Sequence, residues 1–381
     1  MVKGGNLAKV MDHEALSIYT TTLFGIECFF LPILGSQTPF CSESFRRRTW
    51  WQLFKVFIFN ERNLSGPTTR PYQLISTVSD LLFRTFDTGT FINVRLNITA
   101  AYDLSNEMFE AFLSPDMTYS CPIYLERTDP NFESDTLEAA QMRKLDKILA
   151  SVNAQPTGHI LELGTGWGSM CIRAATTIGC KVTTCTLSEM QYQLARKRVK
   201  TLGLEDKITI HLCDYRLLPM PETPYDKIVS VEMMEAMGDH ELETMWATID
   251  RVLKPRGGIC SIQTTTMPES RYKNMFPKGE GLLEAVQKSN AQLDLDSVVQ
   301  YGSHYGRCLL EWNQKFQANY RDVISPLLRE KYQLSDEDLE IFYRKYVYYF
   351  EYTAAGFETK ALSMSHVTFS RPGTLALLQD V

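Results

Sequence analysis

The chain has 381 residues, of which 44% are hydrophobic, and it carries a formal net charge of -6 with a pI near 5.7. This length can bury a large core in two or three domain-sized units, and the acidic balance argues against a nucleic-acid partner, which would require a basic face. Small-molecule or lipid chemistry fits the composition better. The nine cysteines form no C-x-x-C pair, so we interpret them as reduced thiols of a cytoplasmic protein and expect neither a disulfide framework nor a metal site.

The first 60 residues are apolar and aromatic, without the pattern of a cleaved signal peptide. Residues 15–35 are nearly long enough to span a bilayer, but they contain Glu27 and Pro32, and a central carboxylate costs about 2.5 to 3.5 kcal/mol on insertion scales. We interpret this segment as a buried or membrane-touching helix, which leaves peripheral membrane contact open. The rest of residues 1–60 is expected to pack against a helical cap, although a surface for a greasy substrate is the alternative. Residues 72–91 have helical apolar spacing.

The stretch 101–124 combines a predictable helix with a segment that periodicity does not explain. Asp103 or Ser105 can cap a helix over residues 106–113, and the following Ser-Pro-Asp sequence ends it. The next residues, TYSCPIY, have neither helical nor strand spacing.

A strand, a glycine-rich turn and a helix are predicted in the sequence HILELGTGWGSM, at residues 159–170. The apolar run ends at Gly164, further glycines follow at 166 and 168, and an amphipathic helix continues to Ile178. Glycine allows a ligand to approach the backbone, and the free N–H groups at a helix start favour polar or anionic groups. This pattern alone also serves nicotinamide and flavin binders, so its context must decide.

Four more strands are predicted, alternating with helices, at residues 181–187, 207–213, 225–231 and 258–266. This alternation predicts a parallel sheet with ligands at the carboxyl ends of its strands. A dehydrogenase would more usually show G-x-G-x-x-G and an acid closing the second strand, whereas here Glu162 precedes the turn and strand two ends TLSEM. The arrangement resembles class I S-adenosylmethionine (SAM) methyltransferases, so we favour SAM over a dinucleotide.

The resemblance implies an α/β fold with a Rossmann-like, seven-stranded, mainly parallel sheet and an α-helical substrate cap. We expect an N-terminal helical region and cap over 1–135, a SAM-binding core over 136–271, a cap insertion over 272–345, and a C-terminal helix with the last strands over 346–381. The last two strands are expected near 359–364 and 366–371, and amphipathic cap helices at 309–316 and 341–357. The aromatic stripe of the latter helix is typical of core, and it could also line a hydrophobic pocket.

Six motifs make the resemblance more specific. From about residue 98 onward, the chain is similar to the cyclopropane-fatty-acid synthase and mycolic-acid methyltransferase family in the ordered segments YDLSNEMFEAFLSPDMTYSCPIY, ILELGTGWGS, CTLSEMQ, VEMMEAMG, LKPRGG and HYGRCLLEWNQKF. The resemblance implies that SAM contacts Tyr119, Ser120, Glu162, Gly164, Gly166, Trp167, Thr186, Leu187, Gln191, Asp214 and Tyr215. The position of Asp214 at the end of a strand leaves two roles open. Its carboxylate can accept a hydrogen bond from the adenine amine, or it can cap the following turn.

The family reaction implies an anion site. A substrate alkene attacks the sulfonium methyl group, and in the family a bound bicarbonate removes a proton from the resulting carbocation. Cys121, Glu235 and Tyr305 fall on the positions that hold this anion, and Gln263 stands where bacterial members have histidine. Because Glu235 follows strand four, we expect its carboxylate to face the pocket and stabilise a developing cation. Gln263 can donate a hydrogen bond but cannot titrate.

Several functions remain open at this point. The first is methyl transfer to an alkene or nucleophilic carbon of a hydrophobic substrate, either an acyl chain or a polyketide or terpenoid. The second is a pericyclase that uses the sulfonium charge without methyl transfer, and the third is a small-molecule N-methyltransferase. A non-enzymatic lipid-binding protein is the fourth, against which the retained Cys121, Glu235 and Tyr305 argue. The substrate and a homodimeric state are not determined by the sequence.

Overall fold

The computed structural model describes residues 50–59, 105–237, 239–267 and 279–374. The predicted membrane-touching segment at 15–35 and the predicted helix at 72–91 lie outside these residues. Within the described part of the chain, no helix is both long enough and apolar enough to cross a bilayer.

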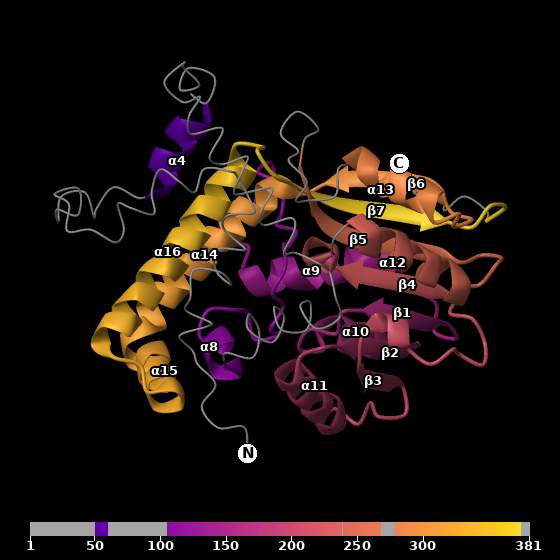
Figure 1. Ribbon diagram of the computed structural model, residues 1–381, viewed down its shortest axis with the longest axis horizontal. Coiled ribbons are helices and arrows are strands. Elements are labelled where there is room, and N and C mark those ends of the chain that lie inside the picture. Colours follow the sequence, from indigo (N-terminus) through magenta and orange to yellow (C-terminus); the bar gives the residue numbers. More distant parts are fainter. Residues whose placement is uncertain (1–49, 60–104, 238, 268–278, 375–381) are drawn as a thin grey trace.

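A seven-stranded sheet occupies one half of the molecule (Figure 1). Its strands are β1 (His159–Leu163), β2 (Lys181–Thr186), β3 (Ile208–Leu212), β4 (Lys227–Val231), β5 (Ile259–Thr266), β6 (Asp294–Gln300) and β7 (Ser363–Ser370), in the spatial order β3-β2-β1-β4-β5-β7-β6. The first five strands are parallel, and β7 runs antiparallel between β5 and β6. The strand order reverses at β1, so a ligand crevice is expected at the carboxyl ends of β1 and its neighbours. The predicted α/β class is confirmed.

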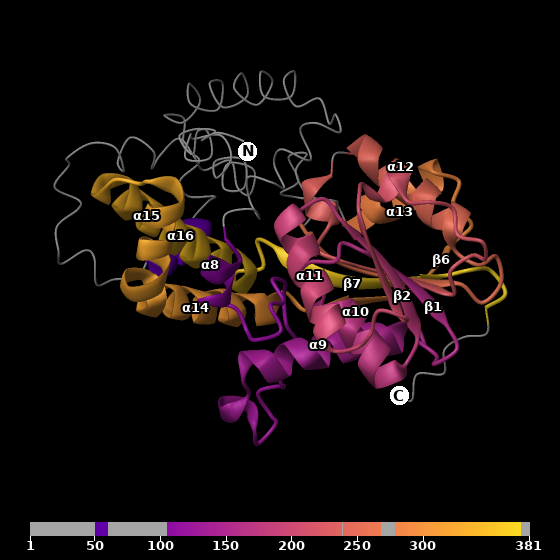
Figure 2. The same cartoon turned by 90° about the horizontal axis from the view of Figure 1, so that it is seen from below.

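Helices bury both faces of the sheet. One face carries α9 (Leu137–Ser151), α10 (Ser169–Arg173) and α11 (Glu189–Thr201), and the other carries α12 (Asp239–Val252) and α13 (Gly279–Lys288). Figure 2 shows α12 and α13 on one side of the sheet and α9 and α10 on the opposite side. On α12, Trp246 and Ile249 are fully buried against the sheet. A sheet covered on both faces requires the near-continuous apolar strands that the sequence shows.

The predicted position of the last two strands is wrong in part. No strand begins at residue 359, because α16 (Asp336–Glu358) ends there in a turn, and the strand at the C-terminal end is β7. Its second partner, β6, comes from the predicted cap insertion at 272–345. This strand forms the sheet edge and its side chains are mostly exposed, so it lacks the apolar alternation that would have revealed it. The described residues 279–300 therefore belong to the sheet layers, and the cap resumes at α14 (Gly302–Asn319).

The helical cap lies beside the sheet and consists mainly of α14, α16 and α15 (Ser325–Tyr332), with α8 (Asn106–Glu110) facing the sheet domain (Figure 1). The predicted cap helices at 309–316 and 341–357 are confirmed as parts of α14 and α16. Ser335 starts α16 with a reciprocal capping box to Asp338. The aromatic stripe is core, because Phe316 and Phe350 are fully buried with ring centroids 5.8 Å apart.

Helix α4 (Trp50–Phe59) packs on the outside of α16 (Figure 1). Phe54 is buried and its ring meets the ring of Tyr348 edge-on at 5.3 Å. The backbone N–H of Trp51 donates to the buried Glu351 carboxylate at 3.0 Å, which satisfies a donor at the helix start. For these ten residues of the N-terminal region, packing against the cap is confirmed.

Candidate active site

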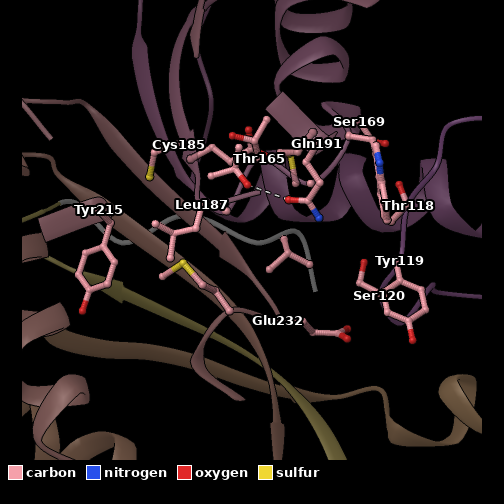
Figure 3. A pocket seen from close by; sticks show the side chains of 18 of the residues that line it. Thr118, Tyr119, Ser120, Thr165, Ser169, Cys185, Leu187, Gln191, Tyr215 and Glu232 are labelled. Carbon is pink, nitrogen blue, oxygen red and sulfur yellow. Dashed lines mark hydrogen bonds between the residues drawn. The ribbon is translucent and has the colours of Figure 1, made fainter. Parts of the chain in front are cut away.

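A cavity of about 200 Å³ opens at the carboxyl ends of β1 to β4 (Figure 3). All eleven residues predicted to contact the cofactor line it: Tyr119, Ser120, Glu162, Gly164, Gly166, Trp167, Thr186, Leu187, Gln191, Asp214 and Tyr215. They come from the glycine turn, from the ends of β2 and β3, and from the segment before α9. The topology therefore brings together what the sequence spreads over almost a hundred residues.

The glycine turn connects β1 to α10 and forms one wall. The backbone has φ values of 93°, 52° and 94° at Gly164, Gly166 and Gly168, a conformation that residues with a Cβ rarely adopt. At Gly166, apart from the glycine and its two chain neighbours, no atom lies within 4 Å of the position that a Cβ would take, so the backbone there faces open space. The turn is held to the neighbouring strand because Thr165 donates its N–H to the Cys185 carbonyl at 2.9 Å. A ligand can thus reach the backbone directly.

Asp214 follows β3 and lines the cavity. Its Oδ1 accepts from the backbone N–H of Arg216 at 2.9 Å, so the capping role that was its alternative is present. The Arg216 guanidinium also forms a two-pronged ion pair with this carboxylate and reaches Glu241 at 3.3 Å. Both Asp214 oxygens are therefore held in place, and Oδ2, which accepts a single bond, retains a lone pair for a ligand amine.

Gln191 lies at the start of α11 and is oriented by its neighbour in the cavity wall. Thr186 donates its hydroxyl to Gln191 Oε1 at 2.8 Å, as the dashed line in Figure 3 marks. This bond occupies the amide oxygen and leaves the amide N–H groups for other acceptors. The position of Gln191 follows from Ser188, which caps α11 by accepting from the Gln191 N–H.

Glu162 and Lys144 bring two buried titratable groups to the same cavity. Glu162 is 3% exposed, and within the described residues its Oε2 has no hydrogen-bond partner. Burial raises the pKa of this carboxyl group to about 8. Lys144 is fully buried and donates to the Ser120 hydroxyl at 2.8 Å. Sequence reasoning missed Lys144, although it lies four residues from Ala140 and Ile148 on the apolar face of α9, where lysine is unusual.

Three of the four predicted catalytic residues meet at a carboxylate that the sequence analysis did not select. Glu232 Oε1 accepts from the Cys121 N–H at 2.7 Å and from Gln263 Nε2 at 2.8 Å. Its Oε2 accepts from the Tyr305 hydroxyl at 2.8 Å. Figure 3 shows the Glu232 carboxylate directed toward the side of the cavity where Tyr119 and Ser120 lie. The donors expected to hold bicarbonate instead hold a side chain of the protein.

The backbone of Glu232 supports a functional role for this cluster. Its φ is 49°, and a non-glycine residue in this region costs about 1 to 3 kcal/mol. The conformation is held because the Glu232 N–H donates to the Gln263 carbonyl on β5 at 2.8 Å. Burial raises the pKa of the carboxyl group, and the hydrogen bonds from Cys121, Gln263 and Tyr305, together with the charge of Lys144, oppose that shift. Burial and the nearby Glu232 raise the pKa of Tyr305 well above its usual value, so its hydroxyl remains a donor.

Glu235 does not take the position expected for it. It is not among the residues that line the cavity, because the short helical turn after β4 directs it toward β5. There its Oε1 accepts from the Thr265 N–H at 2.6 Å and from the Thr264 hydroxyl at 3.2 Å. Burial, together with the nearby Glu232, raises its pKa above the ordinary value. Glu232 also follows strand four, directly after Val231. Its position at the carboxyl end of the strand could have suggested it as a site residue.

Arg198 on α11 ties the segment before the TYSCPIY sequence to the glycine turn. Its Nη1 donates to the Asp116 carbonyl at 2.9 Å and to the Trp167 carbonyl at 2.7 Å. Trp167 is also held from the cap, because its ring N–H donates to Asn106 on α8 at 2.7 Å. The segment that carries Ser120 is thereby fixed across the cavity mouth.

This fold and this cavity define a SAM-dependent enzyme of the class I methyltransferase type. The features that decide the class are the strand reversal at β1, the glycine turn after it, the orphaned Glu162 oxygen and the acid that ends β3. The chain belongs to the mycolic acid cyclopropane synthetase family, whose model matches residues 92–367. The resemblance inferred from the six motifs is thus confirmed.

Individual relatives agree with this assignment. Tuberculostearic acid methyltransferase UfaA1 of Mycobacterium tuberculosis is 35% identical over 297 residues, which cover 73% of this chain and 66% of that protein. The cyclopropane-fatty-acyl-phospholipid synthase of Escherichia coli is 27% identical over 354 residues, covering 90% of this chain and 86% of that protein. Among solved structures, mycolic acid cyclopropane synthase CmaA1 complexed with SAH and CTAB gives a TM-score of 0.62 at 25% identity, covering 72% of this chain and 97% of that chain.

Replacing Arg198 should weaken SAM binding without abolishing it. Arg198→Met removes the two hydrogen bonds to the Asp116 and Trp167 carbonyls. We expect this loss to reduce the free energy of SAM binding by about 1 to 2 kcal/mol, or about 5- to 30-fold in Kd. Calorimetric titration with SAM measures this effect. Arg196→Met is the matched control, because Arg196 is exposed on the same helix. Equal affinities of the two variants would show that the tether does not shape the site.

Proposed function

We propose that this protein transfers the methyl group of SAM to an alkene carbon of a lipid acyl chain, and that Glu232 removes the proton that completes the reaction. The observation that carries the proposal is the Glu232 carboxylate with its three donors, Cys121, Gln263 and Tyr305, at the end of the cofactor cavity. The named relatives support the acyl chain as substrate class, because two of them are named for tuberculostearic acid and for fatty-acyl phospholipid.

The residues of the cavity fit SAM in this role. Glu162 offers an unpartnered carboxyl oxygen, the glycine turn exposes its backbone, and Asp214 can accept from an amine. SAM supplies an electrophilic methyl group, and its transfer to an alkene carbon leaves positive charge on the substrate chain. A preorganised carboxylate stabilises such charge more strongly as it develops than before it exists.

Glu232 then acts as the proton acceptor. The electrons of the broken C–H bond either close a ring with the cationic carbon or form a new double bond, and the proton moves to a Glu232 oxygen. Its three donors hold the carboxylate in one orientation and keep it available as a base, since they oppose the effect of burial on its pKa. The bicarbonate predicted from the family resemblance is not needed in this scheme, because Glu232 occupies its donors.

The same carboxylate weighs against the other functions. A pericyclic rearrangement loses no proton, so a base held by three donors would have no role in it. An N-methyltransferase also requires a base, but the relatives named above are named for fatty acyl substrates. Lipid methylation therefore explains the cluster and the relatives together.

Methyl-deuterated SAM and vesicles of a monounsaturated phospholipid test the proposal. We expect the label in the acyl chains, with SAH as the second product, measured by mass spectrometry of the released fatty acids. Loss of one deuterium would show that the proton leaves the transferred methyl group, and full retention would show that it leaves a chain carbon. Unlabelled lipid with unchanged SAM, across vesicles of several unsaturated chains, would contradict the proposal.

A further inference from the structure

We propose that Lys144 binds the α-carboxylate of SAM, together with the hydroxyl of Ser120. This inference rests on the proposed use of SAM and names a residue that neither the motifs nor the resemblance suggested. Lys144 lies on α9 and lines the cofactor cavity although it is fully buried in the protein. Its Nζ donates to Ser120 Oγ at 2.8 Å.

Lys144 has no direct ion pair within the described residues: burial lowers the pKa of its ammonium group, and the charges of Glu232 and Asp116 only partly oppose that shift. Among the described residues, the hydrogen-bond partner of its Nζ is the Ser120 hydroxyl, which carries no charge. Transfer of an ammonium group from water to a protein interior costs several kcal/mol unless an anion and further hydrogen bonds compensate. Lysine carries three donors, so two remain for a ligand. An anion in the cavity would supply the missing partner.

The charges of the cavity match the amino acid end of SAM. That end carries an ammonium and a carboxylate on one carbon. Glu162 presents an unpartnered buried oxygen to the ammonium, and Lys144 presents unpaired donors to the carboxylate. Both residues line the same cavity as Ser120. Burial disfavours the charged form of each group, and the opposite charges of a bound zwitterion would offset that cost for both.

The backbone of Ser120 is held in a position where its hydroxyl can bind a ligand together with Lys144. Gln141, one turn earlier on α9, donates to the Ser120 carbonyl at 2.8 Å. The Ser120 hydroxyl accepts from Lys144, so its own hydrogen is available to a second acceptor. Because Gln141 and Lys144 are three residues apart on one helix, α9 presents Ser120 and the ammonium group together.

The test compares three ligands by calorimetry with the full chain: SAM, decarboxylated SAM, which lacks only the carboxylate, and methylthioadenosine, which lacks the whole amino acid end. We expect Lys144→Met to weaken SAM by about 10- to 100-fold, the range of hydrogen bonds to charged groups, and to change the other two ligands by less than about threefold. Lys144→Gln should give an intermediate loss for SAM alone. Lys147→Met, an exposed position on the same helix, should change none of the three.

The pattern across ligands decides the result. Equal weakening of SAM and decarboxylated SAM in both Lys144 variants would overturn the inference, since a purely structural role affects both ligands alike. Unchanged SAM affinity in both variants would overturn it as well. A failure of lipid methylation is distinguishable, because it would appear as unlabelled lipid in the deuterated-SAM experiment while SAM affinity still depended on Lys144.

Discussion

Glu232→Gln is expected to lower kcat for lipid methylation by about 10²- to 10⁴-fold, the usual contribution of a general base. The amide keeps the size of the side chain, and its one oxygen can still accept from Cys121 and Gln263, but it cannot take a proton at neutral pH. We expect the Kd of SAM to change by less than about threefold, because the carboxylate is assigned to the substrate rather than to the cofactor. Single-turnover rates and calorimetry on the same preparation separate the two effects.

Glu235→Gln decides between the two glutamates that follow β4. Because Glu235 does not line the cavity and both of its bonds reach one oxygen, an amide that accepts the same bonds from Thr264 and Thr265 should lower kcat far less than Glu232→Gln does. The reverse order of effects would favour Glu235, the glutamate that the sequence analysis had selected for the catalytic site.

A small anion should partly replace the missing side chain. Glu232→Gly removes the carboxylate, leaves the donors of Cys121, Gln263 and Tyr305 unpaired, and suits a backbone φ of 49°. Added bicarbonate or formate is expected to raise the rate of this variant without raising that of the unmodified protein. If neither anion restores activity while SAM still binds, the three donors do not form an anion site.

Glu162→Gln is expected to stabilise the ligand-free protein and to weaken SAM binding. The folded-state pKa of Glu162 is raised from its ordinary value to about 8, so the folded protein binds this proton more tightly than the unfolded chain does. The associated stability is therefore fully present below the unfolded pKa and is lost as pH rises toward 8. Between these two pKa values, the free energy of unfolding of the unmodified protein falls by about 1.4 kcal/mol per pH unit because of Glu162. The Glu162→Gln variant does not lose this stability, because glutamine does not ionise.

Denaturant unfolding of both proteins between pH 5 and about pH 8 measures the effect. The free energy of unfolding of Glu162→Gln minus that of the unmodified protein should increase with pH over this range. Glu235 has a similarly raised pKa, but it is present in both proteins and cancels in the difference. Meanwhile the Kd of SAM should rise by about 10- to 100-fold, because a ligand ammonium loses its charged partner. A difference that stays constant with pH would contradict the assigned protonation of Glu162.

Glu162 and Glu232 illustrate how differently the cofactor half and the catalytic half of the site follow from the sequence. The glycine turn and Glu162 lie in one contiguous strand, turn and helix, where local periodicity and backbone requirements predict the structure directly. The ends of β2 and β3 join them because consecutive βα units of a parallel sheet place their carboxyl ends side by side. All eleven predicted cofactor contacts accordingly line one cavity.

The catalytic half depends on segments far apart in the chain. Gln263 donates to the Cys121 carbonyl across 142 positions, and Tyr305 reaches Glu232 across 73. No local pattern states which of two neighbouring glutamates turns toward these donors, since that depends on the left-handed backbone of Glu232 and its bond to β5. The exposed edge strand β6 escaped prediction for a related reason, because its pairing with β7 and not its own side chains makes it a strand.

The sequence by itself determined the fold class, the family resemblance and the cofactor wall, because short-range periodicity and glycine positions encode them locally. Only the tertiary structure decided that Glu232 occupies the place expected for a bound anion and that Lys144 enters the cofactor cavity. Both outcomes depend on burial and on long-range hydrogen bonds, which exist only once the sheet, α9 and the cap have packed together.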